Sequence, residues 1–595
     1  MQVEPLLPSY LREVLGRFVD ESGRAAVLRW LRSPDFCMTP EQLSAVKSSR
    51  VSFARLLSRR MLAERWQIRR LFFHCDADGD GHARYAIRIG RYDFTYVVRT
   101  FRWDGVEKVG RRADGANRDL FAALFQGVPD EARIAREIAT FNIRDYDVMR
   151  TDAMVTGWTP ANCSARFFEH VVESLTAGRQ PDPAVIGTGT GYMLRNGGYL
   201  ANGRHGTVSY ESYPADHPFR HPYFADMFGL YLVRQISIDW VNAIAAARNP
   251  AGAVKLASDV ARYIGIGNSS GQGMCVALQR WPHWVATWVT VRELALAYAK
   301  SRSIVEDPGR GEALCELLER ARLYYDSVQV QCEDYVVPHQ VLAANLETMR
   351  SWVTEALGNP SDRCWGDLVC RAQASFDPES LEQVNSLLID TYPEFADAVA
   401  EYLPIGADRT RDVVPEMTVG TLRDLVGSRY NWALRRDMRT AEARAHFWYH
   451  SQDSGEQRRG DRVLDPHEHF ESFMDHISAV QRLACVLTVY NDDTPVAEVI
   501  ADTPELAYEI SRVQYLADLP YSEIRGNLIA RGSVPAHLIR FLLAVLGMEC
   551  TNPLSIRYVR GVFYQGMPLA DELATGMETD WSFPASPVVA EAEVA

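Results

Sequence analysis

Lysine is scarce in this chain. Of its 63 basic residues only four are lysines, namely Lys47, Lys108, Lys255 and Lys300. None of the four lies in the glycine-rich pattern of a P-loop, so that class of nucleotide-binding site is excluded. A mechanism that forms a Schiff base is also disfavoured, because it requires one specific buried lysine.

The chain also lacks long apolar runs and paired cysteines. No stretch reaches the roughly 18 uncharged residues that a membrane span needs, and acidic residues stand near the N-terminus where a signal peptide would have its apolar segment. The ten cysteines are scattered without a C-x-x-C spacing, which is typical of reduced thiols and disfavours a four-cysteine zinc site. We therefore expect a cytoplasmic protein with no membrane partner.

What is present is the composition of an ordinary globular protein. The 595 residues are 47% apolar, 24% charged and 10% aromatic, which excludes collagen-like and disulfide-framework classes. Apolar residues recur mostly at helical spacing, whereas 69–75, 84–90 and 92–102 alternate or run aromatic and β-branched between turn residues. The sequence thus predicts a mainly α (α+β) protein with a multi-helix core and a small antiparallel β-meander near the N-terminus.

Breaks in the periodic pattern, rich in glycine, proline and polar residues, divide the chain into five predicted regions. These are an N-terminal helical region at 1–67, the antiparallel β-meander at 68–112, a central helical domain with two glycine-rich loops at 113–302, a helical domain at 303–460, and a C-terminal helical region with a mobile tail at 461–595. Within the central region the spacing predicts helices at 118–142, 163–177, 222–248, 254–264 and 283–300.

Charge is unevenly distributed along the chain. The net charge is −14, yet residues 1–112 hold 21 basic and 13 acidic side chains. The overall acidity disfavours nucleic acid and anionic membranes as partners. The basic N-terminal part either docks on the acidic remainder of its own or another chain or is a polyanion-binding module, although it has neither a zinc-finger spacing nor the aromatic RNA-recognition signature.

The first candidate site is the segment 265–274, which holds four glycines within nine residues. A glycine-rich loop that enters a helix exposes backbone N–H groups and can cradle an anion. Asn268, Ser269 and Ser270 would add polar side chains to such a site. The alternative is a tight corner between two helices. The G-x-S-x-G pattern of a serine hydrolase at 267–271 is disfavoured, because helical rather than strand spacing precedes it.

The second candidate is the glycine-rich segment 187–206, which immediately precedes the most apolar helices of the chain. Loops of this kind approach a ligand closely, and guanidinium groups bind its charged atoms. The candidate substrate-binding residues here are Arg195, Asn196, Asn202 and Arg204. The alternative is a solvated loop without a ligand.

Four charged residues interrupt those apolar helices and form the third candidate. They are Arg234 and Asp239 in the first helix and Arg292 and Glu293 in the second. An unpaired charge in a helix core is costly, so each must pair, reach a water-filled cavity or meet a ligand. We predict that Glu293 has a shifted pKa and does acid–base chemistry, with Arg292 beside it orienting an anionic substrate, and that Arg234 and Asp239 bind substrate. Ion pairing between helices is the alternative.

Histidines concentrate near the start of the last quarter of the chain. Five of the fourteen fall within 446–476. If 439–450 is helical, Glu442, His446 and His450 share one face and make a partial metal site. Solvated histidines beside a charged loop are the alternative.

These candidates give three expectations for function. The leading one is an enzyme of small-molecule metabolism that binds a small anionic substrate or cofactor and does acid–base chemistry. The second is a metal-dependent oxygenase or hydrolase that uses the histidine and glutamate cluster at 442–476, and the third is a non-catalytic scaffold that binds a partner. We allow for a homo-oligomer, and no pattern specifies a cofactor.

Overall fold

The structure is a computed structural model. It describes residues 7–102, 118–141, 154–163, 165–188, 191–196, 213–221, 223–271, 282–327, 336–359, 363–403, 412–437, 439, 448–450, 457–459, 476–525, 535–555, 558–576 and 581–587.

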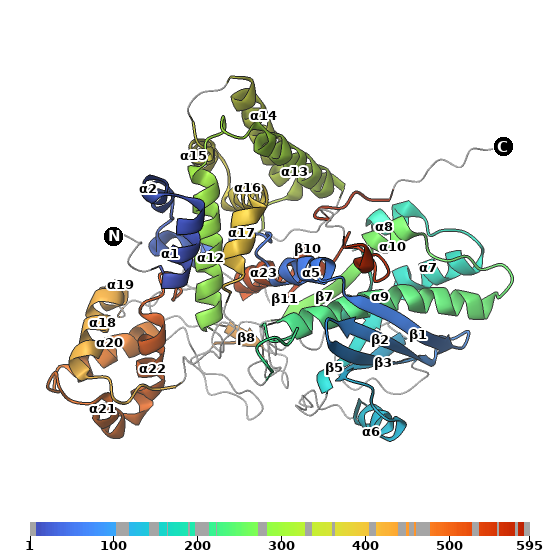
Figure 1. Ribbon diagram of the computed structural model, residues 1–595, viewed down its shortest axis with the longest axis horizontal. Coiled ribbons are helices and arrows are strands. Elements are labelled where there is room, and N and C mark those ends of the chain that lie inside the picture. The colour runs from blue at the N-terminus through green and yellow to red at the C-terminus, as the bar shows by residue number, and fades with distance from the viewer. Residues whose placement is uncertain are drawn as a thin grey trace.

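A nine-stranded sheet forms one layer of the protein (Figure 1). Its strands, in spatial order, are β1 (Gln67–Cys75), β2 (Gly81–Ile89), β3 (Tyr92–Arg102), β4 (Arg118–Gln126), β5 (Met154–Cys163), β6 (Tyr192–Asn196), β7 (Gly265–Gly271), β11 (Tyr558–Phe563) and β10 (Glu549–Ser555). Strands β8 (Trp448–His450) and β9 (Gln457–Arg459) form a separate hairpin. Neighbours in the large sheet are antiparallel except β6 and β7, which are parallel because a helical crossover joins them.

The predicted β-meander is confirmed in β1 to β3, but the sheet is much larger than expected. Residues 118–126 form strand β4 instead of the start of a helix. This strand is buried on both faces, since Leu120, Ala122 and Leu124 belong to the main core and Phe121 packs in a smaller core on the other side. A strand buried on both faces has a continuous apolar run, which periodicity alone does not distinguish from a buried helix.

Helices account for most of the remaining chain, so the mainly α (α+β) fold class is confirmed. The helices that precede β6 in the chain are α1 (Ser9–Phe18), α2 (Glu21–Arg29), α3 (Pro34–Cys37), α4 (Pro40–Ala45), α5 (Phe53–Ala63), α6 (Glu131–Phe141), α7 (Ala165–Thr176) and α8 (Pro183–Thr188). Next come α9 (Phe224–Arg248), α10 (Ser258–Tyr263), α12 (Pro282–Ser301), α13 (Pro308–Ser327), α14 (His339–Gly358), α15 (Trp365–Ser375), α16 (Pro378–Asp390) and α17 (Pro393–Ala400). The last group is α18 (Val419–Arg429), α19 (Asn431–Leu434), α20 (His476–Leu487), α21 (Val496–Asp502), α22 (Ala507–Leu516) and α23 (Pro535–Leu546), with short 3-10 turns at Pro504–Leu506 and Leu573–Thr575. In the described residues no helix has the length and apolarity that crossing a bilayer requires.

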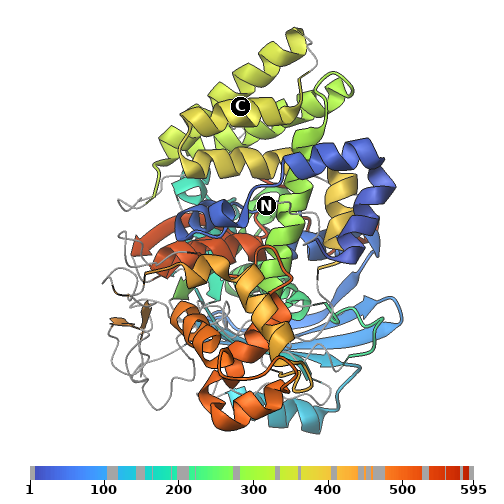
Figure 2. The same ribbon diagram turned by 90° about the vertical axis from the view of Figure 1, so that its left-hand side faces the viewer.

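Two long apolar helices organise the packing. Helix α9 lies against the sheet, whereas α12 runs through the helical layer and packs on α2, α15, α16 and α17 (Figures 1 and 2). Both correspond closely to helices predicted from the sequence. Their nearly complete burial on all sides explains why so few charged residues occur in them.

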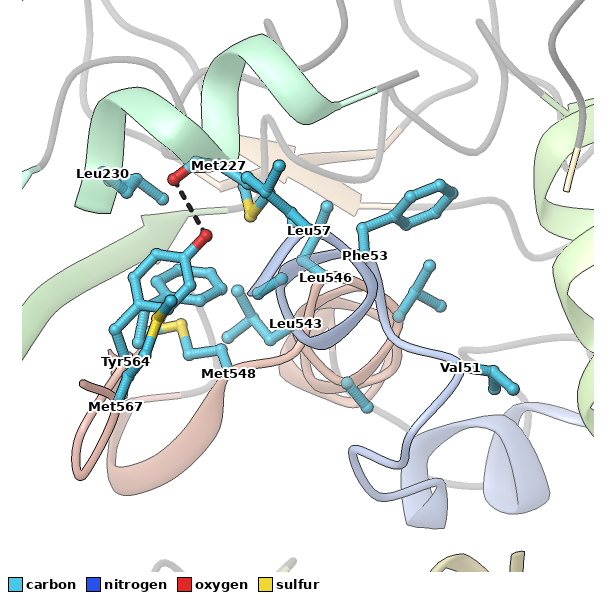
Figure 3. Close-up of a cluster of buried hydrophobic side chains, with 14 of the residues drawn as sticks. Val51, Phe53, Leu57, Met227, Leu230, Leu543, Leu546, Met548, Tyr564 and Met567 are labelled. Carbon is cyan, nitrogen blue, oxygen red and sulfur yellow. Dashed lines mark hydrogen bonds between the residues drawn. The ribbon is translucent and has the colours of Figure 1, made fainter. Parts of the chain in front are cut away.

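The two layers meet where α5, α9, α23 and β11 converge (Figure 3). Phe53 and Leu57 of α5 contact a cluster that includes Met227 of α9 and Leu543 of α23. The hydroxyl of Tyr564 donates to the backbone carbonyl of Met227 at 2.8 Å, which satisfies the polar end of a buried ring. The main core extends along the chain from Leu7 to Phe583, and a second core is confined to residues 419–517.

Basic residues of the N-terminal region dock on acidic helices of the same chain, as one of the two predicted alternatives requires. Five cations between positions 32 and 59 each form an ion pair of this kind. The pairs are Arg32 with Glu293 and Glu382, Lys47 with Glu379, Arg50 and Arg59 with Asp397, and Arg55 with Asp390. The excess positive charge of residues 32–59 therefore serves the packing of the N-terminal helices on α12, α16 and α17.

Candidate functional site

The charges predicted to be catalytic lie in an ion cluster between helices. Glu293 of α12 accepts two hydrogen bonds from the Arg32 guanidinium, at 2.8 and 2.6 Å, and one from Arg292 at 3.1 Å. Glu382 of α16 contacts Arg32 and accepts from the Arg292 Nη2 at 2.7 Å. Two guanidinium groups and two carboxylates thus neutralise one another.

This cluster is unsuited to the acid–base role predicted for Glu293 and Arg292. Both side chains are at most 2% exposed, and neither lines a cavity that the structure describes. Burial alone would raise the pKa of Glu293, but the charges and hydrogen bonds of Arg32 and Arg292 outweigh it and lower that pKa. A carboxylate held ionised and shut off from solvent is a structural group, so pairing between helices, the alternative reading, describes the geometry.

Lys300 lies in the last turn of α12, two turns beyond Glu293, and is only 4% exposed. Among the described residues it has neither an ion pair nor a hydrogen bond from its ammonium group. Burial, and next the positive charge of Arg32, lowers its pKa from 10.5 to about 8. Protonated Lys300 therefore weakens the folded state at neutral pH.

Replacing Lys300 with methionine should stabilise the protein at pH 7 by roughly 3 kcal/mol, the free energy equivalent to this pKa shift. The penalty is fully present below pH 8 and disappears as the pH rises towards 10.5, because the unfolded chain holds the proton longer than the folded one. Urea unfolding of both proteins between pH 7 and 10.5 should show the gap closing. The exposed Lys255→Met variant should show no such gap, and a constant difference between wild type and Lys300→Met would contradict the assignment.

Arg234 of α9 is satisfied entirely by backbone carbonyls. Its guanidinium donates to Ile264 at 2.7 Å, Arg262 at 3.0 Å and Met567 at 2.7 Å, with a longer contact to Pro568 at 3.3 Å. Burial lowers the pKa of Arg234 to about 10. Arg234 therefore joins the start of β7 to the turn after β11. This arrangement leaves no free space beside the guanidinium for the substrate that Arg234 was predicted to bind.

Asp239 lies on the same helix but faces the other end of the sheet. Its carboxylate accepts from Arg70 of β1 at 2.8 Å and from the Tyr85 hydroxyl of β2 at 2.7 Å. Burial raises the pKa of Asp239. The structure therefore separates Asp239 from the ion cluster on α12 and from the start of β7, and this carboxylate is paired instead of facing a substrate.

The two glycine-rich segments do lie side by side, but as strands. Parallel pairing of β6 with β7 sets Arg195 opposite Gly267 and Asn196 opposite Asn268. Ser269 and Ser270 continue β7 and pair with Arg560 and Val559 of β11. The predicted loop that enters a helix is wrong for 265–271, so the backbone N–H groups there bond to neighbouring strands instead of forming an anion cradle. Asn202 and Arg204 lie outside the described residues.

The glycines of these strands make room for side chains that cross over them. A Cβ atom on Gly267 would lie 2.4 Å from the Tyr192 ring, and one on Gly265 would lie 2.4 Å from Val562. Gly191 has a φ of +72° and faces Gln565 at a similar distance. Close packing therefore accounts for Gly191, Gly265 and Gly267, for which the sequence suggested close approach of a ligand.

Three adjoining cavities lie next to β11, and they form the candidate functional site. We call the three cavities inner, middle and outer. The inner and the middle cavity share Ser48 in their linings, and the middle and the outer cavity share Tyr324, Trp581, Phe583 and Pro584. The outer cavity has a volume of about 500 Å³, whereas the inner one holds about 20 Å³, room for roughly one water molecule.

Two cations and one carboxylate are among the polar and apolar side chains that line the inner cavity. Arg540 of α23 donates to both oxygens of Glu379, at 2.8 and 2.6 Å, and the Lys47 ammonium approaches the same carboxylate at 3.1 Å. Burial would raise the pKa of Glu379, but these two cations hold it well below its usual range. Two cations thus face one carboxylate. His339, at the start of α14, also lines this cavity, with its ring 5.0 Å from that of Tyr325.

The outer cavity is aromatic and is closed on one side by the C-terminal segment 581–586. Phe583 packs against Tyr324 and Tyr325, with ring centroids 5.6 and 5.8 Å apart. Arg320 of α13 donates to the backbone carbonyl of Ser582 and holds this segment in place. The cavity volume lies within the range of about 300–1,000 Å³ that is usual for small-molecule sites.

Two of the three residues of the predicted metal site lie outside the described part of the chain. These are Glu442 and His446, and of His450 only the backbone is placed, in the short strand β8. In the parts of the chain that are described, no group of three or more histidine, cysteine, aspartate or glutamate side chains could hold a metal ion. The site at 442–476 stays a prediction.

Sequence reasoning missed the residues of the inner cavity. Lys47, His339, Glu379 and Arg540 are far apart in the chain and belong to no motif. One signal was available: Lys47 is one of only four lysines, which makes the presence of a lysine rather than an arginine at that position notable.

Comparison of the chain with protein-family models, with curated proteins and with solved structures finds no match in any of the three.

Proposed function

We propose that the protein binds a small anionic molecule with a planar, largely apolar body in the three adjoining cavities. The body would lie in the outer cavity between Tyr324, Trp581 and Phe583, and the anionic group would point towards Lys47 and Arg540. The observation that carries this proposal is that an aromatic cavity of about 500 Å³ borders the middle cavity of about 30 Å³, which in turn borders a pocket lined by Lys47 and Arg540.

Charge supports an anion at the inner end. The Lys47 ammonium has three N–H donors, of which one is directed at Glu379. Charged hydrogen bonds in a pocket of low solvent access are stronger than those at a surface. Because the inner cavity has room for about one water molecule, a carboxylate or phosphate group just outside it would be attracted by the charge of Lys47 and would reach the Lys47 donor through that water.

If the protein is an enzyme, His339 is the residue to which we assign an acid–base step, in place of Glu293. Histidine changes charge near neutral pH and can donate or accept a proton. Unlike Glu293, His339 lines a cavity. With this assignment the expected function is still acid–base chemistry, but it would take place at the inner cavity instead of at Glu293.

The proposal is tested by calorimetric titration with benzoate and phenyl phosphate, and with acetate and inorganic phosphate as anions that lack a ring. We expect the ring-bearing anions to bind more tightly. Lys47→Met should weaken their binding about tenfold or more, because it removes a charged hydrogen-bond donor, whereas Lys47→Arg should retain it. In either variant Glu379 still accepts hydrogen bonds from Arg540, so we expect the protein to fold.

Lys255→Met serves as the matched control, since Lys255 is exposed and remote from the cavities. It should bind the same ligands as the wild type. Failure of every ring-bearing anion to bind, or equal binding by wild type and Lys47→Met, would overturn the proposal.

A further inference from the structure

One face of the sheet combines rings and arginines without an evident structural need. Along β2, the residues Ala83, Tyr85 and Ile87 point into the main core. Side chains alternate along a strand, so His82, Arg84 and Arg88 lie on the opposite face. Register places His74 of β1 beside His82, and Phe72 beside Arg84. We call this surface, which covers β1, β2 and the part of β3 next to β2, the basic aromatic face.

Helix α6 covers only the neighbouring part of that side of the sheet. Ile134 of α6 packs on Val97 of β3 and on Phe121, Ala123 and Phe125 of β4, which together make a small separate core. That core does not extend to β1 or β2. Within the described residues, β1 is the edge strand, and its side chains are mostly exposed or half-buried.

Two of the three rings on the basic aromatic face are stacked on each other, and the third lies edge-on to Phe72. The Phe72 and His74 rings are 5.2 Å apart with an angle of 16° between their planes. His82 completes the group, with its ring centroid 5.4 Å from that of Phe72. The Arg84 guanidinium lies 5.6 Å from the Phe72 ring centroid. Flat rings held next to guanidinium groups are the usual platform for unpaired nucleobases.

The arginines of this face are poorly neutralised, unlike those at 32–59. Arg99 of β3 pairs in register with His82, and neither it nor Arg69 has an ion pair within the parts of the chain that the structure describes. Arg84 pairs with Glu131, which is 77% exposed, and Arg88 lies 3.9 Å from Asp93 with both side chains in solvent. Such exposed pairs are weak and readily exchanged for a phosphate.

We propose that the basic aromatic face binds single-stranded nucleic acid, with bases stacked on Phe72, His74 and His82 and phosphates on Arg69, Arg84 and Arg99. The negative net charge of the whole chain, −14, argued against such a partner. The structure concentrates positive charge on one sheet face, however, while the N-terminal arginines are used in packing. This inference does not depend on the ligand proposed for the cavities.

The test is fluorescence anisotropy of the full chain with labelled oligo-dT and oligo-U of about 20 nucleotides and with a duplex of the same length. Single strands should bind at low salt and more tightly than the duplex. Phe72→Ala should weaken binding about fivefold or more, because it removes a stacking platform, and Phe72→Tyr should retain it. Arg99→Ala should lower the slope of log affinity against log salt by about 0.7.

Arg371→Ala is the matched control. Arg371 is 52% exposed and lies 3.9 Å from the Trp352 ring centroid in the helical layer, so it resembles the proposed site in chemistry but not in location. It should leave binding unchanged. Absence of binding at low salt, equal affinity for the duplex, or loss of binding in Arg99→Ala but not in Phe72→Ala would each overturn the proposal. The last outcome would indicate a surface for polyanions or acidic peptides without stacking.

Discussion

Replacing Glu382 with alanine should destabilise the protein by about 3–5 kcal/mol, the range observed when one partner of a buried ion pair is removed. Arg32 and Arg292 would then share Glu293 alone, leaving one guanidinium charge in the interior without a counter-charge. Both carboxylates of the cluster are almost fully buried, so water cannot replace the missing group. Urea or thermal unfolding measures the loss.

The pH dependence of the same cluster gives an independent check. Burial would raise the pKa of Glu382, but Arg32 and Arg292 lower it from 4.5 to about 2. A lowered carboxyl pKa contributes stability that is present above pH 4.5 and is lost as the pH falls towards 2. The difference between wild type and Glu382→Gln should therefore shrink over that interval.

Glu347→Ala is the control for this prediction. Glu347 forms an ion pair with Arg350 at 2.6 Å, but both side chains are about 40% exposed. Surface pairs of this kind contribute less than about 1 kcal/mol. Similar losses for the two variants would mean that burial does not determine the strength of the cluster.

Replacing Arg234 with methionine should destabilise the protein by about 3–5 kcal/mol. The variant removes the guanidinium, so the carbonyls of Ile264 and Met567 lose its N–H donors, whereas the Arg262 carbonyl keeps the Gly566 N–H at 2.8 Å. Each buried acceptor that loses its partner costs about 1–3 kcal/mol, and part of this loss is offset because a buried charge is also removed. Chemical unfolding gives the free energy.

Arg262→Met tests the alternative that any arginine in this region matters. Arg262 lies in the adjacent helix α10, and its side chain is 52% exposed and pairs with Glu572. We expect a loss below about 1 kcal/mol. Hydrogen exchange adds a local measure, since amides of β7 and of β11 should exchange faster in Arg234→Met than in Arg262→Met.

These two predictions share one physical basis. The charged residues within the most apolar helices looked like parts of an active site, because charges rarely occur in a core without a function. In the structure each forms ion pairs or hydrogen bonds with other residues of the protein, and none of them lines the three cavities next to β11. Buried charge is therefore weak evidence for catalysis in this protein, because such charges also serve the packing of helices.

The sequence by itself determined most helices and the first three strands. Apolar spacing predicted α9 and α12 closely. Alternation predicted β1 to β3. These features depend on interactions between residues a few positions apart, which a single sequence displays directly.

Only the tertiary structure decided which charges pair, where the cavities lie and that 265–271 is a strand. Arg32 and Glu382 are 350 positions apart, and β7 becomes a strand because β11, nearly 300 residues later, returns to pair with it. Periodicity carries no record of such partners. The choice between an ion pair and an active site, or between a loop and a strand, is made by contacts that form only when distant segments pack together.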